Sequence, residues 1–220
     1  MVILTLTKEN VDSAIDEALV VLNRGGIIAY PTETFYGLGV KFDMAGSLKR
    51  LYDIKKRPRE KAMPVVIDSR QCLPQLVPEE WLQHIPPATQ SLMERFWPGP
   101  VTLLFPAKPG LSEYLTAATG LIAVRVPGES FALQLAAGAG FPITATSANP
   151  SGTPPAGSAE AVVSSFGDGI DLLIDGGQTP GGQPSTIVDV SGKRLGVVRK
   201  GAMADTVTFF LNEQQGFMHP

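Results

Sequence analysis

The chain has 220 residues, of which 44% are hydrophobic, and a formal net charge of −3. This is enough apolar material for one large domain, and the mild acidity is unlike that of a dedicated RNA-binding domain. Its one cysteine, Cys72, excludes an intrachain disulfide and a multi-cysteine metal site, and it suits a reducing cytoplasm. Because the sequence has no basic leader and no run of about 18 apolar residues, we expect a cytoplasmic protein without a membrane span.

The first third of the chain alternates apolar runs with a helical pattern. Apolar side chains recur at helical spacing from Val11 to Leu22, and Gly25 and Gly26 then end the pattern. In chain order we predict a strand over residues 2–6, a helix over 11–22, a strand over 27–30, a helix over 45–54 and a strand over 63–67.

The rest of the chain repeats this alternation until it nears the carboxyl end. We predict strands over residues 101–105, 121–126, 142–145, 171–174, 186–190 and 195–199, and helices over 88–96, 131–137 and 159–166. Glycine-rich turns join the last strands without a helix between them, so we expect some antiparallel pairing there. The order predicts an α/β fold: a twisted open sheet of mixed parallel and antiparallel strands, flanked by helices, in a single domain.

A dense cluster of positive charge follows the second predicted helix. Seven Lys and Arg side chains fall within residues 49–61, with only Asp53 and Glu60 against them, in a chain of net negative charge. Such a run is often a solvated helix end, where cations complement the carbonyl end of the helix dipole. The alternative that the pattern leaves open is a binding site for an anion.

A second polar segment, S-A-N-P-S-G at residues 147–152, follows directly after a predicted buried strand. Each of these residue types also suits a plain turn. Loops at strand ends are, however, where α/β sheets place ligands. Lys55 and Arg57 of the basic cluster would neutralise phosphates, whereas Ser147 and Asn149 would bond phosphate oxygens without adding charge. The combination favours a site for nucleotide phosphates.

Several other kinds of site are excluded by what the sequence lacks. It contains neither the G-x-x-x-x-G-K-[ST] phosphate loop nor the G-x-G-x-x-G dinucleotide fingerprint. His84 and His219 are its only histidines, which argues against a histidine-based metal site and against a Ser-His-Asp triad. We therefore expect His84 at the surface and no metal held by the protein itself.

Seven phrases of the sequence carry a family resemblance. In this order they are GGIIAYPTETFYGLG (residues 25–39), KKRP (55–58), FWPGPVT (96–102), VRVP (124–127), ATSANPSG (145–152), STIVD (185–189) and VRKGA (198–202). Together they closely resemble the YrdC-like threonylcarbamoyladenylate synthases. The resemblance covers about residues 8–203 and implies the single-domain form of the family, with residues 204–220 as a short C-terminal extension.

The resemblance implies a nucleotidyltransferase that makes threonylcarbamoyl-adenylate and pyrophosphate from L-threonine, bicarbonate or CO2, and ATP accompanied by Mg2+. The product would supply the N6-threonylcarbamoyl group at position 37 of tRNA through a downstream threonylcarbamoyl transferase complex. Contact with tRNA or double-stranded RNA is a further expectation, because a local basic groove attracts a phosphate backbone.

The family's site residues fall on matching positions of this sequence. As the resemblance implies, ATP would be contacted by Lys55, Arg57, Lys61, Ser147, Asn149 and Arg199. Lys55 and Arg57 would be the catalytic cations. The implied threonine pocket consists of Thr32, Thr34, Arg125 and Ser185. Arg125 would pair with the threonine carboxylate through two parallel hydrogen bonds.

Plainer structural roles stay open for the residues of the threonine pocket. Thr32 and Thr34 also suit hydrogen bonds to turn backbone. Arg125 also suits an ion pair at a strand edge, and Ser185 suits the first position of a strand.

Two positions depart from the common pattern of the family. Lys56 stands where many members have glycine, and Val66 is followed by Ile67 and Asp68 where many members read V-H-I, which bears on the threonine pocket. Two other functions stay open: a paralogue of the same fold that binds RNA or a nucleotide without making this adenylate, and a carbamoyl-adenylate-handling module like that of hydrogenase maturation proteins.

Overall fold

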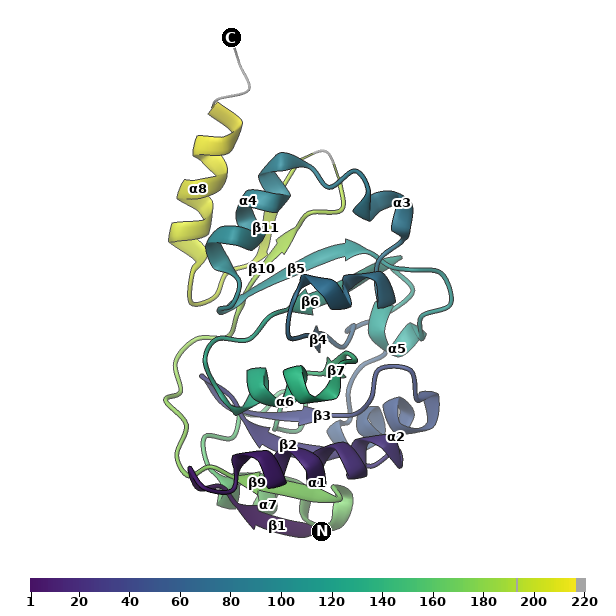
Figure 1. Ribbon diagram of the computed structural model, residues 1–220, viewed down its shortest axis with the longest axis vertical. Helices are drawn as coiled ribbons and strands as arrows, with labels where there is room; N and C mark the ends of the chain where they lie inside the picture. Colours follow the sequence, from purple (N-terminus) through teal and green to yellow (C-terminus); the bar gives the residue numbers. More distant parts are fainter. Residues whose placement is uncertain (193, 217–220) are drawn as a thin grey trace.

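The computed structural model describes residues 1–192 and 194–216, which form strands and helices in alternation (Figure 1). The predicted α/β class with mixed parallel and antiparallel strands is confirmed. The strands are β1 (Val2–Thr5), β2 (Ile28–Pro31), β3 (Tyr36–Gly39), β4 (Val65–Val66), β5 (Val101–Pro106), β6 (Leu121–Arg125), β7 (Ile143–Thr144), β8 (Thr146–Ser147), β9 (Leu172–Asp175), β10 (Thr186–Asp189) and β11 (Gly196–Arg199). The helices are α1 (Val11–Asn23), α2 (Ala45–Lys55), η1 (Arg70–Gln75), α3 (Glu79–Leu82), α4 (Pro87–Phe96), α5 (Glu113–Thr116), α6 (Phe131–Ala139), α7 (Ala159–Phe166), η2 (Gly167–Gly169) and α8 (Ala204–Gly216).

The strands divide between two sheets that meet in the middle of the molecule. One sheet has the order β1-β9-β2-β3-β8, and the other has the order β11-β10-β5-β6-β4-β7. A bridge between Lys41 and Ile143 joins them, and the Thr144 amide donates to the Val40 carbonyl at 3.0 Å. β7 and β8 are separated only by Ala145. The strand predicted over residues 142–145 therefore corresponds to β7, at the edge of one sheet, and the chain continues directly into β8, at the edge of the other.

β3 is a strand that the sequence did not predict. Its residues, Y-G-L-G, lack the apolar alternation that identifies a strand. The glycines are required by close packing, since a Cβ at Gly39 would lie 2.8 Å from side-chain atoms of Ile143 and Tyr30. The short helices α3 and α5 were also missed, because four residues are too few for a helical period to be recognised.

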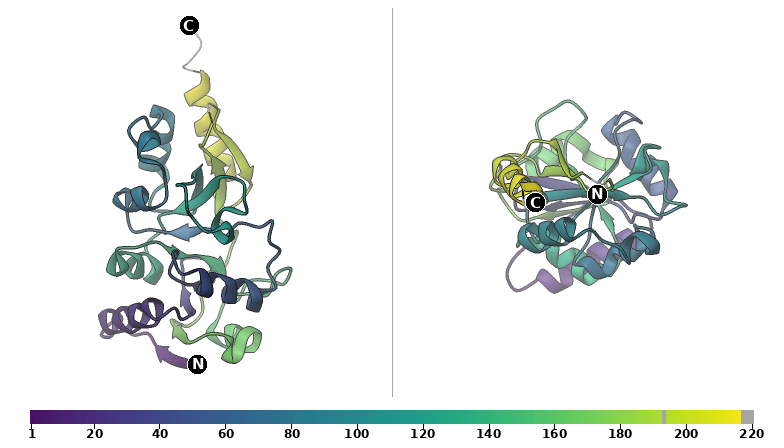
Figure 2. Two further views of the ribbon diagram at one scale, coloured as in Figure 1. Left: turned by 90° about the vertical axis from the view of Figure 1, so that its right-hand side faces the viewer. Right: turned by 90° about the horizontal axis from the view of Figure 1, so that it is seen from above.

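Helices cover both faces of the sheet with the order β1-β9-β2-β3-β8. α1 and α6 lie on one face, and α2 and α7 lie on the other (Figure 2). Ala14, Ala18 and Leu22 of α1 are buried at intervals of one helical turn, and burying a side chain such as Leu22 contributes about 1.5–3 kcal/mol. Gly138 lets α6 approach α1 closely, because a Cβ there would lie 2.7 Å from Cγ2 of Ile15.

The carboxyl-terminal part adds strands without intervening helices, as predicted. β10 runs parallel to β5 and antiparallel to β11, which confirms the expected antiparallel pairing. α8 follows, and its Phe210 ring packs edge-to-face on Phe96 of α4 at 5.5 Å between centroids. Residues 217–220 of the predicted extension, His219 among them, lie outside the described residues. His84 is exposed, as expected. No helix of the described segments has both the length and the apolar character to cross a membrane.

Candidate functional site

Lys55 joins the two polar segments that the sequence singled out. Its side chain is 2% exposed, and its Nζ donates to the carbonyl oxygens of Ser147 at 2.5 Å and Asn149 at 2.6 Å. The Lys55 carbonyl in turn accepts from the Ser151 amide at 2.9 Å. The K-x-R and S-x-N motifs therefore form one unit, although 92 residues separate Lys55 from Ser147.

Lys55 is the last residue of α2, whereas the sequence predicted it in the following loop. The helix ends because Lys56 adopts a left-handed conformation with φ 48°, from which its amide bonds the Asp53 carbonyl. Glycine takes this conformation without strain, which explains why glycine is common at this position in the resembling family. Lys56 keeps this geometry at the cost of backbone strain. The side chain of Lys55 extends into the interior.

Burial changes the protonation of Lys55. Desolvation, followed by the nearby positive charge of Arg57, lowers the pKa of Lys55 from 10.5 to about 7. An anion bound nearby would restore the charged form, because opposite charge favours the ammonium. Near neutral pH the protonation of Lys55 is therefore sensitive to what occupies the site.

Arg57 and the S-x-N side chains mainly brace the loops that carry them. Arg57 donates to the Lys61 carbonyl at 2.9 Å and to the Ala62 carbonyl at 2.6 Å. Ser147 Oγ donates to Asn149 Oδ1 at 2.5 Å, and Asn149 Nδ2 donates onward to the Thr153 carbonyl at 2.5 Å. The Lys61 side chain is exposed at the end of the loop. Two loops, each braced by its own hydrogen bonds, thus lie together, with cations in one and neutral polar groups in the other.

The fold brings Arg199, which was predicted to contact ATP, together with Ser185, which was predicted for the threonine pocket. Arg199 donates to the Ser185 carbonyl at 2.7 Å and to its Oγ at 3.0 Å, and Ser185 Oγ also contacts Thr102 Oγ1 at 2.8 Å. Gly201 permits this approach, because a Cβ there would lie 2.2 Å from the Pro184 carbonyl oxygen. Arg199 is exposed as a whole residue, yet partial desolvation of its guanidinium group and the charge of Arg57 lower its pKa.

Arg125 is held by a carboxylate that the sequence did not single out. Its Nε donates to the Gly99 carbonyl at 2.9 Å, and its Nη2 is in contact with Oε1 of Glu33, which also accepts from the Gly128 amide at 3.1 Å. Both partners are largely buried, with 14% and 19% of their side chains exposed. Burial lowers the pKa of Arg125 to about 10, so the guanidinium stays charged at neutral pH.

The Glu33–Arg125 pair is incompletely satisfied. Among the described residues, Glu33 Oε2 is buried without a hydrogen bond, whereas Arg125 Nη2 is occupied by the other carboxylate oxygen. Buried polar groups normally find partners, so this pair is ready to accept a polar ligand. The signal in the sequence was available: Glu33 lies between the two predicted threonines, Thr32 and Thr34.

Thr32 and Thr34 lie beside this pair, in the turn before β3. Thr32 Oγ1 donates to the Phe35 carbonyl at 2.7 Å and accepts from the Thr34 amide at 3.1 Å. Thr32 Oγ1 also lies 3.2 Å from Thr34 Oγ1. The turn role left open by the sequence is thus real for Thr32, and it fixes both hydroxyls near Glu33.

Four predicted cations belong to one electrostatic group. Desolvation is the larger cause in each case, and beyond it the charge of Arg57 lowers the pKa of both Lys55 and Arg199, and the charge of Arg199 lowers the pKa of Arg125. Like charges that destabilise one another in this way are relieved by a bound anion. Within the described segments, no three His, Cys, Asp or Glu side chains gather as metal ligands would. The arrangement is therefore suited to polyphosphate and carboxylate groups.

Glu33→Gln is expected to enlarge the thermal stabilisation that a carboxylate ligand, such as the L-threonine implied by the family resemblance, would give. The variant should unfold at a lower temperature than the original chain, because Arg125 loses its buried counter-ion. A ligand carboxylate would then meet no competitor for the guanidinium. Differential scanning fluorimetry with L-threonine and with L-threoninol, which lacks the carboxylate, measures this. An unchanged or smaller shift with L-threonine would show that Glu33 assists the ligand instead of competing with it.

Comparison with protein families gives a match over most of the chain. The Sua5/YciO/YrdC family model, described as telomere recombination, matches residues 20–201. Three curated relatives are named threonylcarbamoyl-AMP synthase. That of Pyrococcus abyssi is 37% identical over 170 residues, 77% of this chain and 48% of its own length. That of Bacillus subtilis is 36% identical over 193 residues, which are 87% of this chain and 54% of the length of that relative. That of Enterobacter sp. is 34% identical over 184 residues, which are 83% of this chain and 94% of the length of that relative.

The chain spans about half the length of the first two of these relatives and nearly all of the third. Among solved structures, P. abyssi Sua5 complexed with L-threonine matches with a TM-score of 0.81 at 34% identity, over 91% of this chain and 57% of that one. Escherichia coli YciO matches with a TM-score of 0.77 over 91% of this chain and 95% of that one. Its 24% identity supports the fold alone.

Proposed function

The chain belongs to the Sua5/YciO/YrdC family, and we propose that it is a threonylcarbamoyl-AMP synthase. The observation that carries the proposal is that Lys55, Arg57, Arg199 and Arg125 form one electrostatic group, in which Arg57 acts on Lys55 and on Arg199, and Arg199 acts on Arg125. A reaction that brings together a triphosphate and an amino-acid carboxylate requires such a concentration of cations. The names of the curated relatives support the same reading.

The ATP part of the site would consist of the joined loops. In the proposed complex, ATP contacts Lys55, Arg57, Lys61, Ser147, Asn149 and Arg199. Mg2+ enters with ATP and is held by phosphate oxygens and water, which fits a site whose own side chains are cationic or neutral. Since Lys55 and Arg57 donate to backbone carbonyls, their side chains are oriented before the substrate arrives. Preorganised charge of this kind stabilises the transition state without reorganisation.

The threonine part would be formed by Thr32, Thr34, Arg125 and Ser185. The P. abyssi Sua5 structure with L-threonine supports an amino-acid site in a protein of this fold. Arg125 would bind the threonine carboxylate through its guanidinium. The Glu33 oxygen that has no hydrogen bond would accept one from a donor group of the ligand. The threonine amine adds to CO2 and loses a proton to give the carbamate. One carbamate oxygen then attacks the α-phosphorus. The bond from the α-phosphorus to the bridging oxygen breaks, and pyrophosphate leaves with its electron pair.

No protein nucleophile takes part in this scheme, so catalysis rests on positioning and on charge. The product would pass to a threonylcarbamoyl transferase complex acting on tRNA, and we place the protein in the cytoplasm with that machinery. Direct contact with tRNA or double-stranded RNA belongs to the same proposal.

The test is to incubate the purified protein with ATP, Mg2+ and bicarbonate, adding L-threonine, L-serine or no amino acid. Pyrophosphate release and the mass of the adenylate are measured together. A product that needs both L-threonine and bicarbonate supports the proposal. ATP binding without this product would overturn it in favour of a paralogue with another substrate.

ATP binding is expected to be accompanied by proton uptake at about pH 8. In the free protein Lys55 has a pKa of about 7 and is mostly neutral there, and a neighbouring triphosphate favours its charged form. At about pH 6 the ammonium is already present in the free protein, so the uptake should disappear. Calorimetry in buffers of different ionisation enthalpy measures the protons. The Lys56→Met variant should still take up protons when ATP binds. Proton uptake that persists in the Lys55→Met variant would contradict the assignment of this proton to Lys55.

A further inference from the structure

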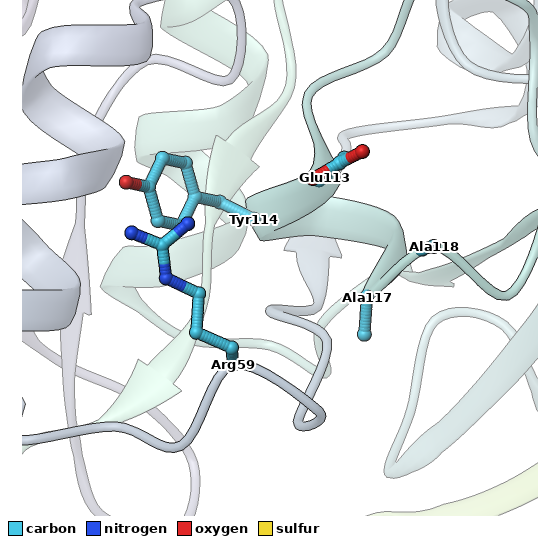
Figure 3. A pocket seen from close by; sticks show the side chains of 5 residues that line it. All are labelled: Arg59, Glu113, Tyr114, Ala117 and Ala118. Carbon is cyan, nitrogen blue, oxygen red and sulfur yellow. The ribbon is translucent and has the colours of Figure 1, made fainter.

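A small cavity lies beside the basic loop, outside the proposed ATP and threonine groups. It has a volume of about 240 Å³ and is lined by Arg59, Glu113, Tyr114, Ala117 and Ala118. Figure 3 shows Arg59 rising beside the Tyr114 ring on one side, with Ala117 and Ala118 across from them. Pockets that enclose a whole drug-sized ligand measure roughly 300–1,000 Å³, so this one suits a single ring system.

Alternating cationic and aromatic groups connect the cavity to the anion site. The Arg57 guanidinium lies 5.9 Å from the centre of the Tyr52 ring, and the Tyr52 and Tyr114 rings lie 4.8 Å apart at 52°. The Arg59 guanidinium lies 5.1 Å from the centre of the Tyr114 ring. Tyr52 Oη lies within hydrogen-bond distance of the carbonyls of Tyr114 and Lys61, which orients the Tyr52 ring. Tyr52 is buried, so the half-buried Tyr114 ring and the exposed Arg59 guanidinium are the planar groups of this row that another planar group can reach.

Strained backbone is concentrated around the same cavity. In the described part of the chain, the non-glycine residues with positive φ are Lys56 at 48°, Ala117 at 48° and Ala118 at 55°. Two of them line the cavity, and the third starts the loop that carries Arg59. Each left-handed residue costs on the order of 1 kcal/mol, and such strain gathers at binding sites.

The rim of the cavity is positively charged. Lys56, Arg59 and Lys61 are all exposed, and none of them forms an ion pair within the described residues. Glu113 is the one carboxylate of the lining, and in Figure 3 its side chain points away from Arg59. A ligand that combines a flat ring with attached phosphate would match both the stacking surfaces and the charge.

We propose that this cavity is a binding site for a nucleobase, stacked on Tyr114 and the Arg59 guanidinium, with its phosphates on the exposed cations of the loop. Proteins bind unstacked bases on aromatic rings and arginine planes in this way. The base can come from a free nucleotide or from an RNA strand, and the chemistry of recognition is the same. The site does not depend on the synthase proposal, because its stacking residues, Arg59 and Tyr114, are assigned to neither ATP nor threonine. Of the cations on its rim, only Lys61 is also a proposed ATP contact.

The test compares two labelled strands in a fluorescence anisotropy titration at fixed salt, without amino acid or bicarbonate. One is a short oligoadenylate RNA, and the other is a strand of equal length with abasic ribose. Phosphate attraction is the same for both, so any preference reports the base. The intact protein is expected to bind the oligoadenylate about tenfold more tightly, the effect of roughly one stacked base.

Matched variants locate the preference in the cavity. Tyr114→Leu and Arg59→Lys should remove it, the latter because lysine keeps the charge but not the plane. Tyr114→Phe should retain it, and circular dichroism confirms that each variant is folded. AMP added as competitor identifies the source: displacement of the strand indicates free nucleotides, and its absence indicates RNA. Equal binding of the two strands, or a preference that survives Tyr114→Leu, would overturn the proposal.

Discussion

Lys55→Met is expected to reduce adenylate formation by at least about 100-fold, the effect of losing one preorganised donor in an active site. The methionine side chain has nearly the same length but cannot donate a hydrogen bond. The carbonyls of Ser147 and Asn149 then lose the ammonium that holds them, so the S-x-N loop is no longer fixed to α2. One positive charge also leaves the cation group. Both effects act on the same phosphates.

The variant should nevertheless remain folded, because two energetic effects oppose one another. Each carbonyl left without a partner in the interior costs about 1–3 kcal/mol. Removing a lysine whose pKa has fallen from 10.5 to about 7 returns several kcal/mol at neutral pH, since burial of the ammonium was unfavourable. Thermal unfolding followed by circular dichroism checks that the loss of activity is not a loss of fold.

Lys56→Met is the matched control for this experiment. Lys56 is the neighbouring lysine, its side chain is exposed, and its left-handed conformation strains methionine and lysine alike. Pyrophosphate release should stay close to that of the unaltered chain. A folded Lys55→Met protein that turns over as fast as this control would show that the Lys55 clamp is not needed for the reaction.

The fold class was readable from the sequence because its evidence is local. Apolar residues at helical spacing identified α1, and continuous apolar runs identified β5 and β6. β3 escaped, because its glycines are there for contacts with Tyr30 and Ile143 that are distant in the sequence. For the same reason the division into two sheets was unreadable: the bridge from Lys41 to Ile143 is a tertiary feature.

The candidate site shows a similar boundary between what the sequence predicts and what it does not. Charge clustering and neutral polar loops pointed to Lys55 and Ser147, and the fold joins these two residues. Their manner of contact was not predictable, since Lys55 bonds backbone carbonyls and turns away from solvent. Glu33 was overlooked because a lone carboxylate in a loop has no pattern of its own, and its place between Thr32 and Thr34 was the one signal available. Only the fold brings it to Arg125.

Arg125→Ala is expected to raise the KM for L-threonine by about 100-fold or more while changing the KM for ATP much less. Truncating one partner of a buried charge contact costs about 2–5 kcal/mol, and each 1.4 kcal/mol is tenfold in affinity. The single variant also leaves the Glu33 carboxylate buried without its cation, which destabilises the fold. The double variant Glu33→Gln with Arg125→Ala removes that cost and isolates the effect on the substrate.

Arg70→Ala serves as the control, because Arg70 forms an exposed ion pair with Glu94 at 3.6 Å and such pairs contribute about 0–1 kcal/mol. Its KM values should match those of the unaltered chain. Binding of L-threoninol, measured by calorimetry, adds a test from the ligand side. The intact protein should prefer L-threonine over this analogue, and the double variant should not, because the group that reads the carboxylate is gone. A double variant that still prefers L-threonine would assign carboxylate recognition to another cation, and Arg199 is the neighbour whose charge reaches the same region.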